Sequence, residues 1–354
     1  MEIPPQFVTL EHESGGRMKI KQLGRTGLRV TEVCLGTMTF GNQCDEPTSF
    51  AILNRAWQAG VNFIDTADVY PIPPTLSTVG ATETIIGRWM KANPGRRHEV
   101  VLATKCYGKM GNGPNDSGLS RRHIMDAIDA SLQRLQTDFI DLYQAHSYDP
   151  GTPLDETLRA LDDLVRSGKV RYIGCSNYFG YQLAKALWVS DKLGIARYDC
   201  VQPRYNLLYR EFESELFPLC QQEQVGVIVY NPLAGGFLTG KHRREAGPEA
   251  GSRFTLGDAG KLYRGRYWQD AQFDAVESMK NFLKGRGKPI TQVALAWVLA
   301  KPFVTSAIVG ASKPDQLDGS LPAVDLELDK EEMEFLDGIW YNLPRVQEPR
   351  SASR

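Results

Sequence analysis

One stretch of the chain decides the fold: it runs from Val33-Cys34-Leu35 through Phe50-Ala51-Ile52-Leu53-Asn54-Arg55-Ala56-Trp57-Gln58-Ala59-Gly60 to Asn62-Phe63-Ile64. The two outer segments are short apolar runs, which are typical of buried strands. In the middle segment, Ile52-Leu53 and Ala56-Trp57 fall on one helical face, and Gly60 is a natural C-terminal stop. The stretch therefore predicts a strand, a helix and a second strand, the unit from which parallel sheets are built.

The same alternation of strand and helix continues along the chain. Further strands are predicted at residues 100–103, 140–143, 170–175, 200–201, 225–230 and 306–309, with helices between them. Eight such units favour an α/β fold with a single (β/α)8 barrel, which typically takes about 250 residues before insertions. The alternative is a doubly wound open sheet, which calls for G-x-G-x-x-G after the first strand. The chain instead reads Leu35-Gly36-Thr37-Met38-Thr39-Phe40-Gly41 there, so the barrel is favoured.

Two additions to the barrel are expected. Residues 19–29 alternate like a hairpin with a glycine-containing turn, and we expect this hairpin to close the bottom of the barrel. A long segment, 235–269, follows the seventh strand and contains basic residues and glycines, so we expect it to fold over a bound ligand as a lid. The predicted domain spans residues 18–345, between flexible tails at 1–17 and 346–354.

Composition excludes several classes of protein. The 354 residues carry 41 Lys and Arg against 42 Asp and Glu, so no basic excess exists to bind the phosphates of a nucleic acid. With 42% hydrophobic residues the chain can form a large core, which excludes wholesale disorder. The six cysteines form no C-x-x-C pair, so we expect reduced thiols, no metal site and a cytoplasmic protein. No apolar run is long enough for a membrane span.

Polar residues follow the predicted strands at the end where a barrel carries its active site. Asp65 and Tyr70 follow the second strand, Lys105 follows the third and His146 follows the fourth. Each of these alone is more often structural, as a rim lysine, a core histidine, a loop-capping aspartate or a packed tyrosine. Together they suit carbonyl reduction, because an ammonium group lowers the pKa of a phenol and a carboxylate holds the ammonium in place. A nearby histidine can then orient the carbonyl oxygen.

Several longer motifs around these residues match one known family in order and spacing. They are Gly60-Val61-Asn62-Phe63-Ile64-Asp65-Thr66-Ala67-Asp68-Val69-Tyr70, Thr104-Lys105, Asp141-Leu142-Tyr143-Gln144-Ala145-His146, Gly168-Lys169-Val170-Arg171-Tyr172-Ile173-Gly174-Cys175-Ser176-Asn177 and Tyr230-Asn231-Pro232-Leu233. Over residues 18–336 the chain thereby resembles the aldo-keto reductases, among them a bacterial branch with an insertion after the tyrosine motif, potassium-channel β subunits and aryl-alcohol dehydrogenase-like members. The resemblance implies an NAD(P)H-dependent oxidoreductase on a (β/α)8 barrel. It implies that Tyr70 is the general acid, that Lys105 and Asp65 tune its pKa, and that His146 orients the carbonyl.

The resemblance also implies a site for NADPH (NADP+) and no metal. Ser176, Asn177 and Gln202 match residues that bind the nicotinamide amide, and Tyr230 matches the aromatic residue that stacks on its ring. Residues 309–317 resemble the loop and helix start that bind the adenosine phosphate, where free N–H groups attract anions. Lys241, Arg253 and Lys313 match cations near the phosphates, which favours NADPH over NADH. The other positions implied to contact the cofactor are Gly36, Thr37, Met38, Asp65, Asn231, Pro232, Leu233, Gly235, Gly310, Ser312 and Gln316.

Two departures from the family pattern concern ligands. Gly319-Ser320 stand where the family usually has a Glu-Asn pair that contacts the adenine, and residues 71–80 form an insertion beside the pocket. The substrate is less well defined by the sequence than the cofactor. Aromatic and apolar residues that could line a pocket for aryl or bulky carbonyl compounds are Tyr107, Met110, Tyr148, Tyr267 and Trp268.

The predicted activity is the reduction of a small-molecule aldehyde or ketone, whether aryl, bulky aliphatic or a keto-sugar, to the alcohol by NADPH. One alternative is an enzyme that works physiologically as an alcohol or sugar dehydrogenase. An alternative of another class is a cofactor-binding partner subunit of the channel-β type with little turnover. A metal-dependent hydrolase is disfavoured because the sequence lacks a convergent set of His and Asp ligands. The sequence leaves homo-oligomer formation open, and it predicts no nucleic-acid or membrane partner.

Overall fold

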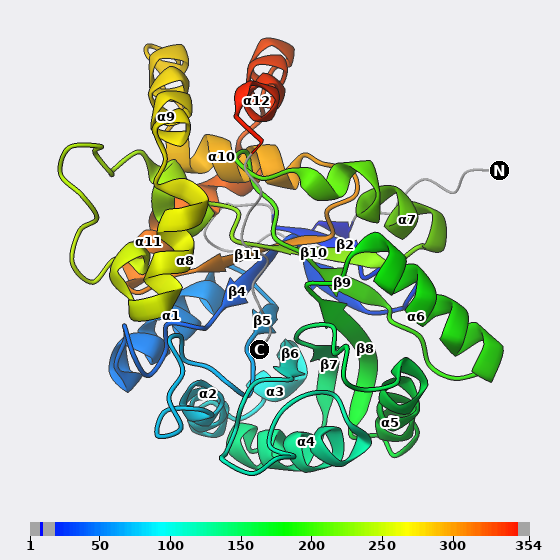
Figure 1. Cartoon of the computed structure of the whole chain (residues 1–354). Coiled ribbons are helices and arrows are strands. Elements are labelled where there is room, and N and C mark those ends of the chain that lie inside the picture. Colours follow the sequence, from blue (N-terminus) through cyan, green and yellow to red (C-terminus); the bar gives the residue numbers. More distant parts are fainter. Residues whose placement is uncertain (1–7, 10–17, 346–354) are drawn as a thin grey trace.

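The apolar segments that alternate with helices along the sequence form a closed barrel of parallel strands (Figure 1). The structure, a computed structural model, describes residues 8–9 and 18–345. The strands follow chain order around the barrel, and Gly310 pairs with Gly36 where the last strand meets the first. The barrel strands are β4 (Val33–Gly36), β5 (Phe63–Asp65), β6 (Val101–Cys106), β7 (Ile140–Ala145), β8 (Val170–Ser176), β9 (Cys200–Gln202), β10 (Gly226–Tyr230) and β11 (Ser306–Gly310). The predicted (β/α)8 barrel is confirmed.

Strands β6 and β7 run further than the sequence predicted. Their apolar runs end at residues 103 and 143, whereas the strands continue to Cys106 and Ala145. The added residues include Thr104, Lys105 and Gln144, which are polar but completely buried. Where a strand ends in buried polar residues, the apolar run stops before the strand does. Hydropathy alone therefore cannot locate the end of such a strand. Lys105 consequently lies within β6, one residue before its end.

Helices cover the outside of the barrel (Figure 1). The first of them, α1 (Glu46–Gln58), begins earlier than the predicted residue 50 because the Asp45 side chain caps it by accepting a hydrogen bond from Thr48 N at 2.9 Å. Its apolar face is the one predicted, since Ile52, Leu53 and Ala56 are buried. The other outer helices are α2 (Ala81–Ala92), α3 (Arg96–Glu99), α4 (Arg121–Leu135), α5 (Leu154–Arg166), α6 (Gly180–Leu193), α7 (Leu216–Glu223), α10 (Ile290–Leu299), α11 (Pro314–Ser320) and α12 (Lys330–Asn342).

The long segment after β10 is largely helical. Its two 3-10 turns are η2 (Ala234–Thr239) and η3 (Arg253–Thr255), and its first helix is α8 (Gly257–Tyr267). The next helix, α9 (Asp270–Leu283), projects from the barrel beside α12 in Figure 1. The predicted long connection is therefore present, and much of it forms an additional helical layer.

The hairpin closes the N-terminal end of the barrel, as expected. β2 (Lys19–Gln22) pairs antiparallel with β3 (Arg29–Thr31), and Leu23 and Val30 pack into the barrel interior. Gly24 has a φ of +56° and approaches β9 and β10 so closely that a Cβ would lie 2.7 Å from Asp199 O and Gly226 N. β1 (Val8–Thr9) pairs with β2 and adds a third strand. Apart from β1, the predicted tails 1–17 and 346–354 lie outside the described residues, and the domain limits 18–345 stay a prediction.

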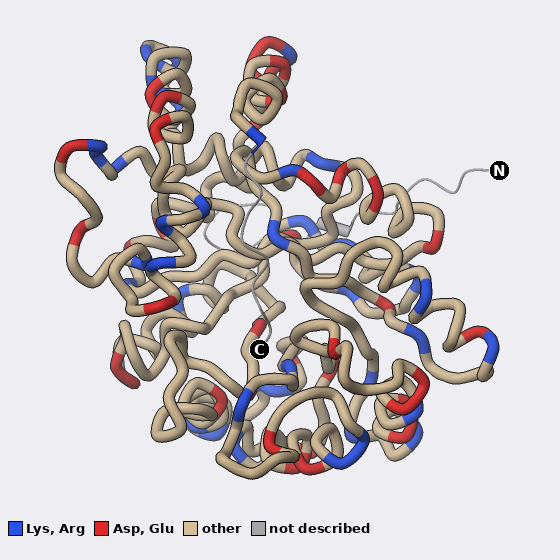
Figure 2. Tube along the Cα trace, viewed as in Figure 1, with Lys and Arg blue, Asp and Glu red and all other residues tan. Residues whose placement is uncertain are grey.

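Charges of both signs are spread over the outer helices. Figure 2 shows Lys and Arg interleaved with Asp and Glu along them. Many of these side chains pair, for example Arg88 with Glu46 at 2.7 Å and Lys288 with Glu332 at 2.6 Å. Across the part of the chain that the structure describes, no helix has the length and apolar character needed to cross a membrane.

Candidate active site

Asp65 and Lys105 form an ion pair at the C-terminal ends of two neighbouring strands. Asp65 is the last residue of β5, and Lys105 lies on β6. Lys105 Nζ lies 2.6 Å from Asp65 Oδ2 and donates a second hydrogen bond to the Thr66 carbonyl oxygen at 2.8 Å. The Lys105 side chain is 0% exposed. Two protein oxygens thus replace water around the ammonium group, which a buried charge requires.

Two glutamines hold the other oxygen of Asp65. Gln202 Nε2 donates to Asp65 Oδ1 at 2.8 Å, and Gln144 Nε2 donates to the same atom at 3.3 Å. Side chains from β6, β7 and β9 therefore fix the orientation of one carboxylate. Gln144 was not identified as a site residue from the sequence. Its signal is that of an amide near the end of a predicted strand, two residues before His146.

Tyr70 and His146 lie beside this ion pair. Their rings meet edge to face with centroids 5.7 Å apart, and Lys105 Nζ lies 5.2 Å from the centroid of the Tyr70 ring. Both side chains line the same cavity and stay partly exposed to it. The structure therefore brings the four predicted catalytic residues, Asp65 included, together at one place.

Burial and charge set the protonation states of these groups. Burial raises the pKa of the Tyr70 hydroxyl, and the Lys105 ammonium offsets only part of this rise. Burial opposes the charge on Lys105, but attraction to Asp65 and Tyr70, together with the hydrogen bond to Asp65, outweighs burial, so the pKa of Lys105 is raised. Burial, together with repulsion from Lys105, lowers the pKa of His146 to about 3. At neutral pH Tyr70 is protonated and His146 is neutral, and the expected lowering of the Tyr70 pKa is present only as that partial offset.

A cavity of about 1290 Å³ opens beside these residues. It is lined by every residue that the sequence predicted for the cofactor site, although they come from strands all around the barrel and from the long segment after β10. They are Gly36, Thr37, Met38, Asp65, Ser176, Asn177, Gln202, Tyr230, Asn231, Pro232, Leu233, Gly235, Lys241, Arg253, Gly310, Ser312, Lys313 and Gln316. Gly319 and Ser320 line it as well, so the cavity reaches from Tyr70 and His146 to α11.

Hydrogen bonds connect the ends of β8, β9 and β10 within the cavity wall. Ser176 Oγ donates to the Gln202 carbonyl oxygen at 2.8 Å. The Tyr230 hydroxyl donates to Asn177 Oδ1 at 2.9 Å, and Asn177 Nδ2 donates to the His146 carbonyl oxygen at 2.9 Å. The Tyr230 ring is thus tied to the loop that carries His146.

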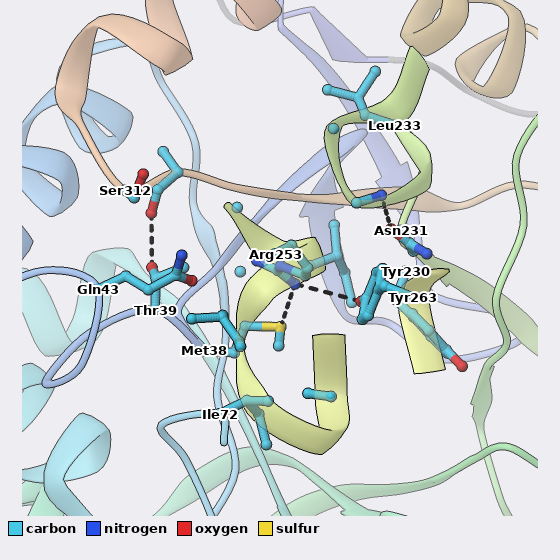
Figure 3. Close-up of a pocket in the computed structure, with 18 of the residues that line it drawn as sticks. Met38, Thr39, Gln43, Ile72, Tyr230, Asn231, Leu233, Arg253, Tyr263 and Ser312 are labelled. Carbon is cyan, nitrogen blue, oxygen red and sulfur yellow. Dashed lines mark hydrogen bonds between the residues drawn. The ribbon is translucent and has the colours of Figure 1, made fainter. Parts of the chain in front are cut away.

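The Arg253 side chain contacts residues on two sides of the cavity. Its guanidinium contacts Met38 Sδ at 2.9 Å and the Tyr263 hydroxyl at 3.4 Å (Figure 3). Met38 follows β4, whereas Tyr263 lies on α8. A second link joins Gln43 Nε2 to the Gly251 carbonyl oxygen at 3.1 Å. The segment 235–269 therefore lies across the cavity, where the sequence predicted a lid.

The loop at 309–317, where the sequence predicted an anion site, has one of its amides bonded internally. Helix α11 is short, and the Ser312 amide donates to Gln316 Oε1 at 2.8 Å, so this N–H group is already engaged. Lys313 is exposed and lines the cavity. The Ser312 N–H is therefore not free for an anion, whereas the charge of Lys313 faces the cavity.

The aromatic and apolar residues predicted for the substrate pocket do not all lie at the cavity. Tyr107 lines the cavity, whereas Met110, Tyr148, Tyr267 and Trp268 are not among its lining residues. Tyr148 packs edge to face against Tyr178 with centroids 5.4 Å apart, and Tyr267 is 1% exposed. Tyr267 is therefore a core residue at the end of α8, whereas Tyr148 and Trp268 are partly buried and pack against the core.

The sequence analysis missed the cavity-facing side of α8. Ala259, Leu262, Tyr263 and Arg266 all line the cavity. Their spacing of three and four residues is the signal that could have found them, since residues so spaced share one helical face. The other cavity residues missed from the sequence include Thr39, Asn42, Gln43, Ser147 and His242.

The sequence profile of the Aldo/keto reductase family matches residues 32–341. The chain belongs to this family. It is 41% identical over 328 residues to the oxidoreductase YrpG of Bacillus subtilis (strain 168), an alignment that covers 91% of this chain and 96% of that protein. It is 36% identical over 343 residues to protein tas of Escherichia coli (strain K12), with coverage of 91% and 97%. It is also 38% identical over 311 residues to a probable voltage-gated potassium channel subunit beta of Oryza sativa subsp. japonica, with coverage of 87% and 92%.

Membership of the aldo/keto reductase family makes the protein an NAD(P)H-dependent oxidoreductase that reduces carbonyl groups of small molecules. The resemblance carried by the sequence motifs is thereby confirmed. Within residues 8–9 and 18–345, no three His, Cys, Asp or Glu side chains are placed to hold a metal ion.

Proposed function

We propose that this aldo/keto reductase uses NADPH to reduce an aldehyde or ketone to the alcohol, with Tyr70 as the general acid. The observation that supports this most is the buried ion pair of Lys105 and Asp65 beside a protonated phenol that faces the cavity. A phenol in this position can donate its proton to a carbonyl oxygen. The Lys105 ammonium then stabilises the phenolate that remains, which lowers the cost of the proton transfer.

His146 suits the role of orienting the carbonyl. A neutral imidazole carries one N–H donor, and the pKa of about 3 keeps His146 neutral at physiological pH. Its ring lies edge to face with Tyr70, so both groups address the same part of the cavity. A carbonyl oxygen that accepts hydrogen bonds from both would have its carbon turned toward the interior of the cavity.

The cavity fits a dinucleotide. Its volume of about 1290 Å³ exceeds the roughly 300–1,000 Å³ of pockets for small ligands. The cofactor supplies the hydride when bound. The amide nitrogen of Gln202 is engaged by Asp65, so Gln202 would meet a ligand carboxamide through Oε1, next to Ser176 and Asn177. The Tyr230 ring, held by its hydroxyl, offers a flat surface for stacking.

Of the four Lys and Arg residues that line the cavity within the described part of the chain, three, all but Arg266, are the predicted phosphate partners and favour NADPH over NADH. Lys241, Arg253 and Lys313 all line it, and the additional phosphate of NADPH carries the charge that they would bind. Lys241 pairs only loosely with Glu249, at 3.9 Å, and both side chains are largely exposed. The backbone of Gly319 and the hydroxyl of Ser320 stand where Glu and Asn side chains are usual in the family, so we expect weak contacts with the adenine.

The substrate end of the cavity is apolar on one side. Val69, Ile72 and Tyr107 line it near Tyr70. These residues support an aryl or bulky aliphatic carbonyl compound as substrate more than a keto-sugar, which needs several polar partners. Tyr70, Lys105 and His146 would also serve the reverse reaction, in which the Tyr70 phenolate accepts the proton of an alcohol.

Absorbance of NADPH, followed across a panel of aldehydes, ketones and keto-sugars, tests this function. We expect turnover by the wild type, and a loss of roughly 10²–10⁴-fold in kcat for Tyr70→Phe with cofactor binding retained. Full activity of Tyr70→Phe would refute the role of Tyr70. NADPH binding without turnover in either direction would favour a partner subunit instead, the role that the name of the potassium channel relative indicates for that protein.

A further inference from the structure

Tyr267, the last residue of α8, lies behind the cavity wall and joins that helix to two barrel strands. Its side chain is 1% exposed. Its hydroxyl accepts hydrogen bonds from Asn206 Nδ2 at 3.1 Å and from Asn231 Nδ2 at 2.9 Å. Asn206 lies in the loop after β9, and Asn231 directly follows β10. One hydroxyl group therefore links the segment that lies across the cavity to the ends of both strands.

The turn that follows β10 adopts an unusual backbone conformation. Asn231 has a φ of +64° and Ala234 a φ of +51°, in the left-handed region that costs roughly 1–2 kcal/mol for a residue other than glycine. Such a turn persists only when surrounding groups hold it. Asn231 Oδ1 accepts a hydrogen bond from Gly235 N, and Asn206 Nδ2 donates to the Asn231 carbonyl oxygen at 2.9 Å. The amide groups that hold the turn are the two that Tyr267 binds.

The turn directly follows Tyr230, whose ring lines the cavity. The backbone of Tyr230 is fixed by hydrogen bonds to Pro203 O at 3.0 Å and from Tyr205 N at 3.2 Å, and its hydroxyl is fixed by Asn177. The direction in which the chain leaves Tyr230 is set by the conformation of Asn231. A change in that turn therefore removes the support on the C-terminal side of Tyr230 and leaves the ring to the bonds with Pro203, Tyr205 and Asn177. Asn177 also bonds the His146 carbonyl oxygen, so a shift of the ring alters its placement relative to His146.

We propose that Tyr267 is a positioning residue for the nicotinamide end of the cofactor site. Its hydroxyl fixes the left-handed turn at Asn231 and thereby the orientation of the Tyr230 ring. The identity of the ligand rests on the proposed function, whereas the support of the turn by Tyr267 rests on geometry alone. Without the hydroxyl, two amide groups lose a buried acceptor, and the turn loses the partner that holds both of them.

Fluorescence titration of Tyr267→Phe with NADPH and with 2′,5′-ADP, which lacks the nicotinamide half, separates positioning from general weakening. We expect NADPH to bind about tenfold more weakly and 2′,5′-ADP to bind as tightly as to the wild type. The matched control is Tyr198→Phe, which removes a buried hydroxyl that bonds Tyr178 outside the cavity. We expect Tyr198→Phe to bind NADPH and 2′,5′-ADP with wild-type affinity. Equal weakening for both ligands, or no change in either, would overturn the proposal.

Amide hydrogen exchange of the protein without added ligand provides a readout that needs no cofactor. We expect faster exchange at residues 231–236 in Tyr267→Phe, and wild-type exchange there in Tyr198→Phe. Unchanged exchange at residues 231–236 would overturn the proposal whatever the titrations show. A wild-type protein that bound no NADPH would overturn the proposed function instead, while the exchange data would still decide whether Tyr267 holds the turn.

Discussion

The Lys105 ammonium lies 2.6 Å from the Asp65 carboxylate, and the two side chains are only 0% and 4% exposed. Each partner of such a pair needs the other, because a lone buried charge is far more costly than the pair. Lys105 also stands beside Tyr70, where its charge eases the loss of the phenolic proton. We therefore propose two roles for the ion pair, one in stability and one in the acid strength of Tyr70, and substitutions can separate them.

Lys105→Met removes one partner and leaves Asp65 buried without its cation. We expect a loss of about 3–5 kcal/mol in the free energy of unfolding, measured by urea denaturation. Adding Asp65→Asn removes the remaining charge and restores much of that stability. The double variant stays inactive, with kcat at least roughly 100-fold below the wild type, because no ammonium stabilises the phenolate. Recovery of activity together with stability would contradict the acid-strength role of Lys105.

His146 makes stability fall as the pH is lowered. Its pKa is about 3 in the fold, below its usual value of about 6.5, so the unfolded chain takes up a proton that the folded chain refuses. The contribution is fully present above pH 6.5 and is lost toward pH 3, at up to about 1.4 kcal/mol per pH unit. We expect His146→Asn to show a shallower decline of unfolding free energy between pH 6.5 and 4. His98, which is exposed, provides the control substitution His98→Asn. If His98→Asn made the pH dependence of the unfolding free energy equally shallow, this interpretation would be contradicted.

Asp199 lies at the opposite end of the barrel from the cavity and has the reverse pH dependence. Burial raises its pKa to about 6, with a partial offset from Arg197 and Arg25. Its stabilising contribution is present below its unfolded pKa of about 4 and is lost as the pH rises through 6. We expect Asp199→Asn to raise the free energy of unfolding at pH 7.5 by roughly 1–3 kcal/mol without changing activity. The exposed Asp138 gives the control, since Asp138→Asn should leave stability unchanged.

The sequence predicted the barrel, and the meeting of the candidate catalytic residues at one rim, because both depend on local patterns. Apolar runs mark strands such as β10, and Asp65, Tyr70 and His146 follow strands whose ends meet at one rim of a barrel. Contacts across the barrel could not be predicted in this way. Gln144 binds Asp65 from another strand, and Tyr267, which looked like a pocket residue, is turned inward by amides far away in the sequence. Such pairings depend on register and on the path of the long segment, which hydropathy does not encode.

Arg253 separates phosphate recognition from closure of the segment that lies across the cavity. Arg253→Met keeps the length of the side chain and removes the charge that would bind the extra phosphate of NADPH. We expect the Kd for NADPH to rise roughly 10–100-fold and that for NADH to change little, by fluorescence titration. Arg243→Met, in the same segment but exposed and outside the cavity lining, is the control and should change neither. If NADPH and NADH weakened by the same factor, the contacts of Arg253 with Met38 and Tyr263 would explain its effect, because those contacts serve either cofactor equally.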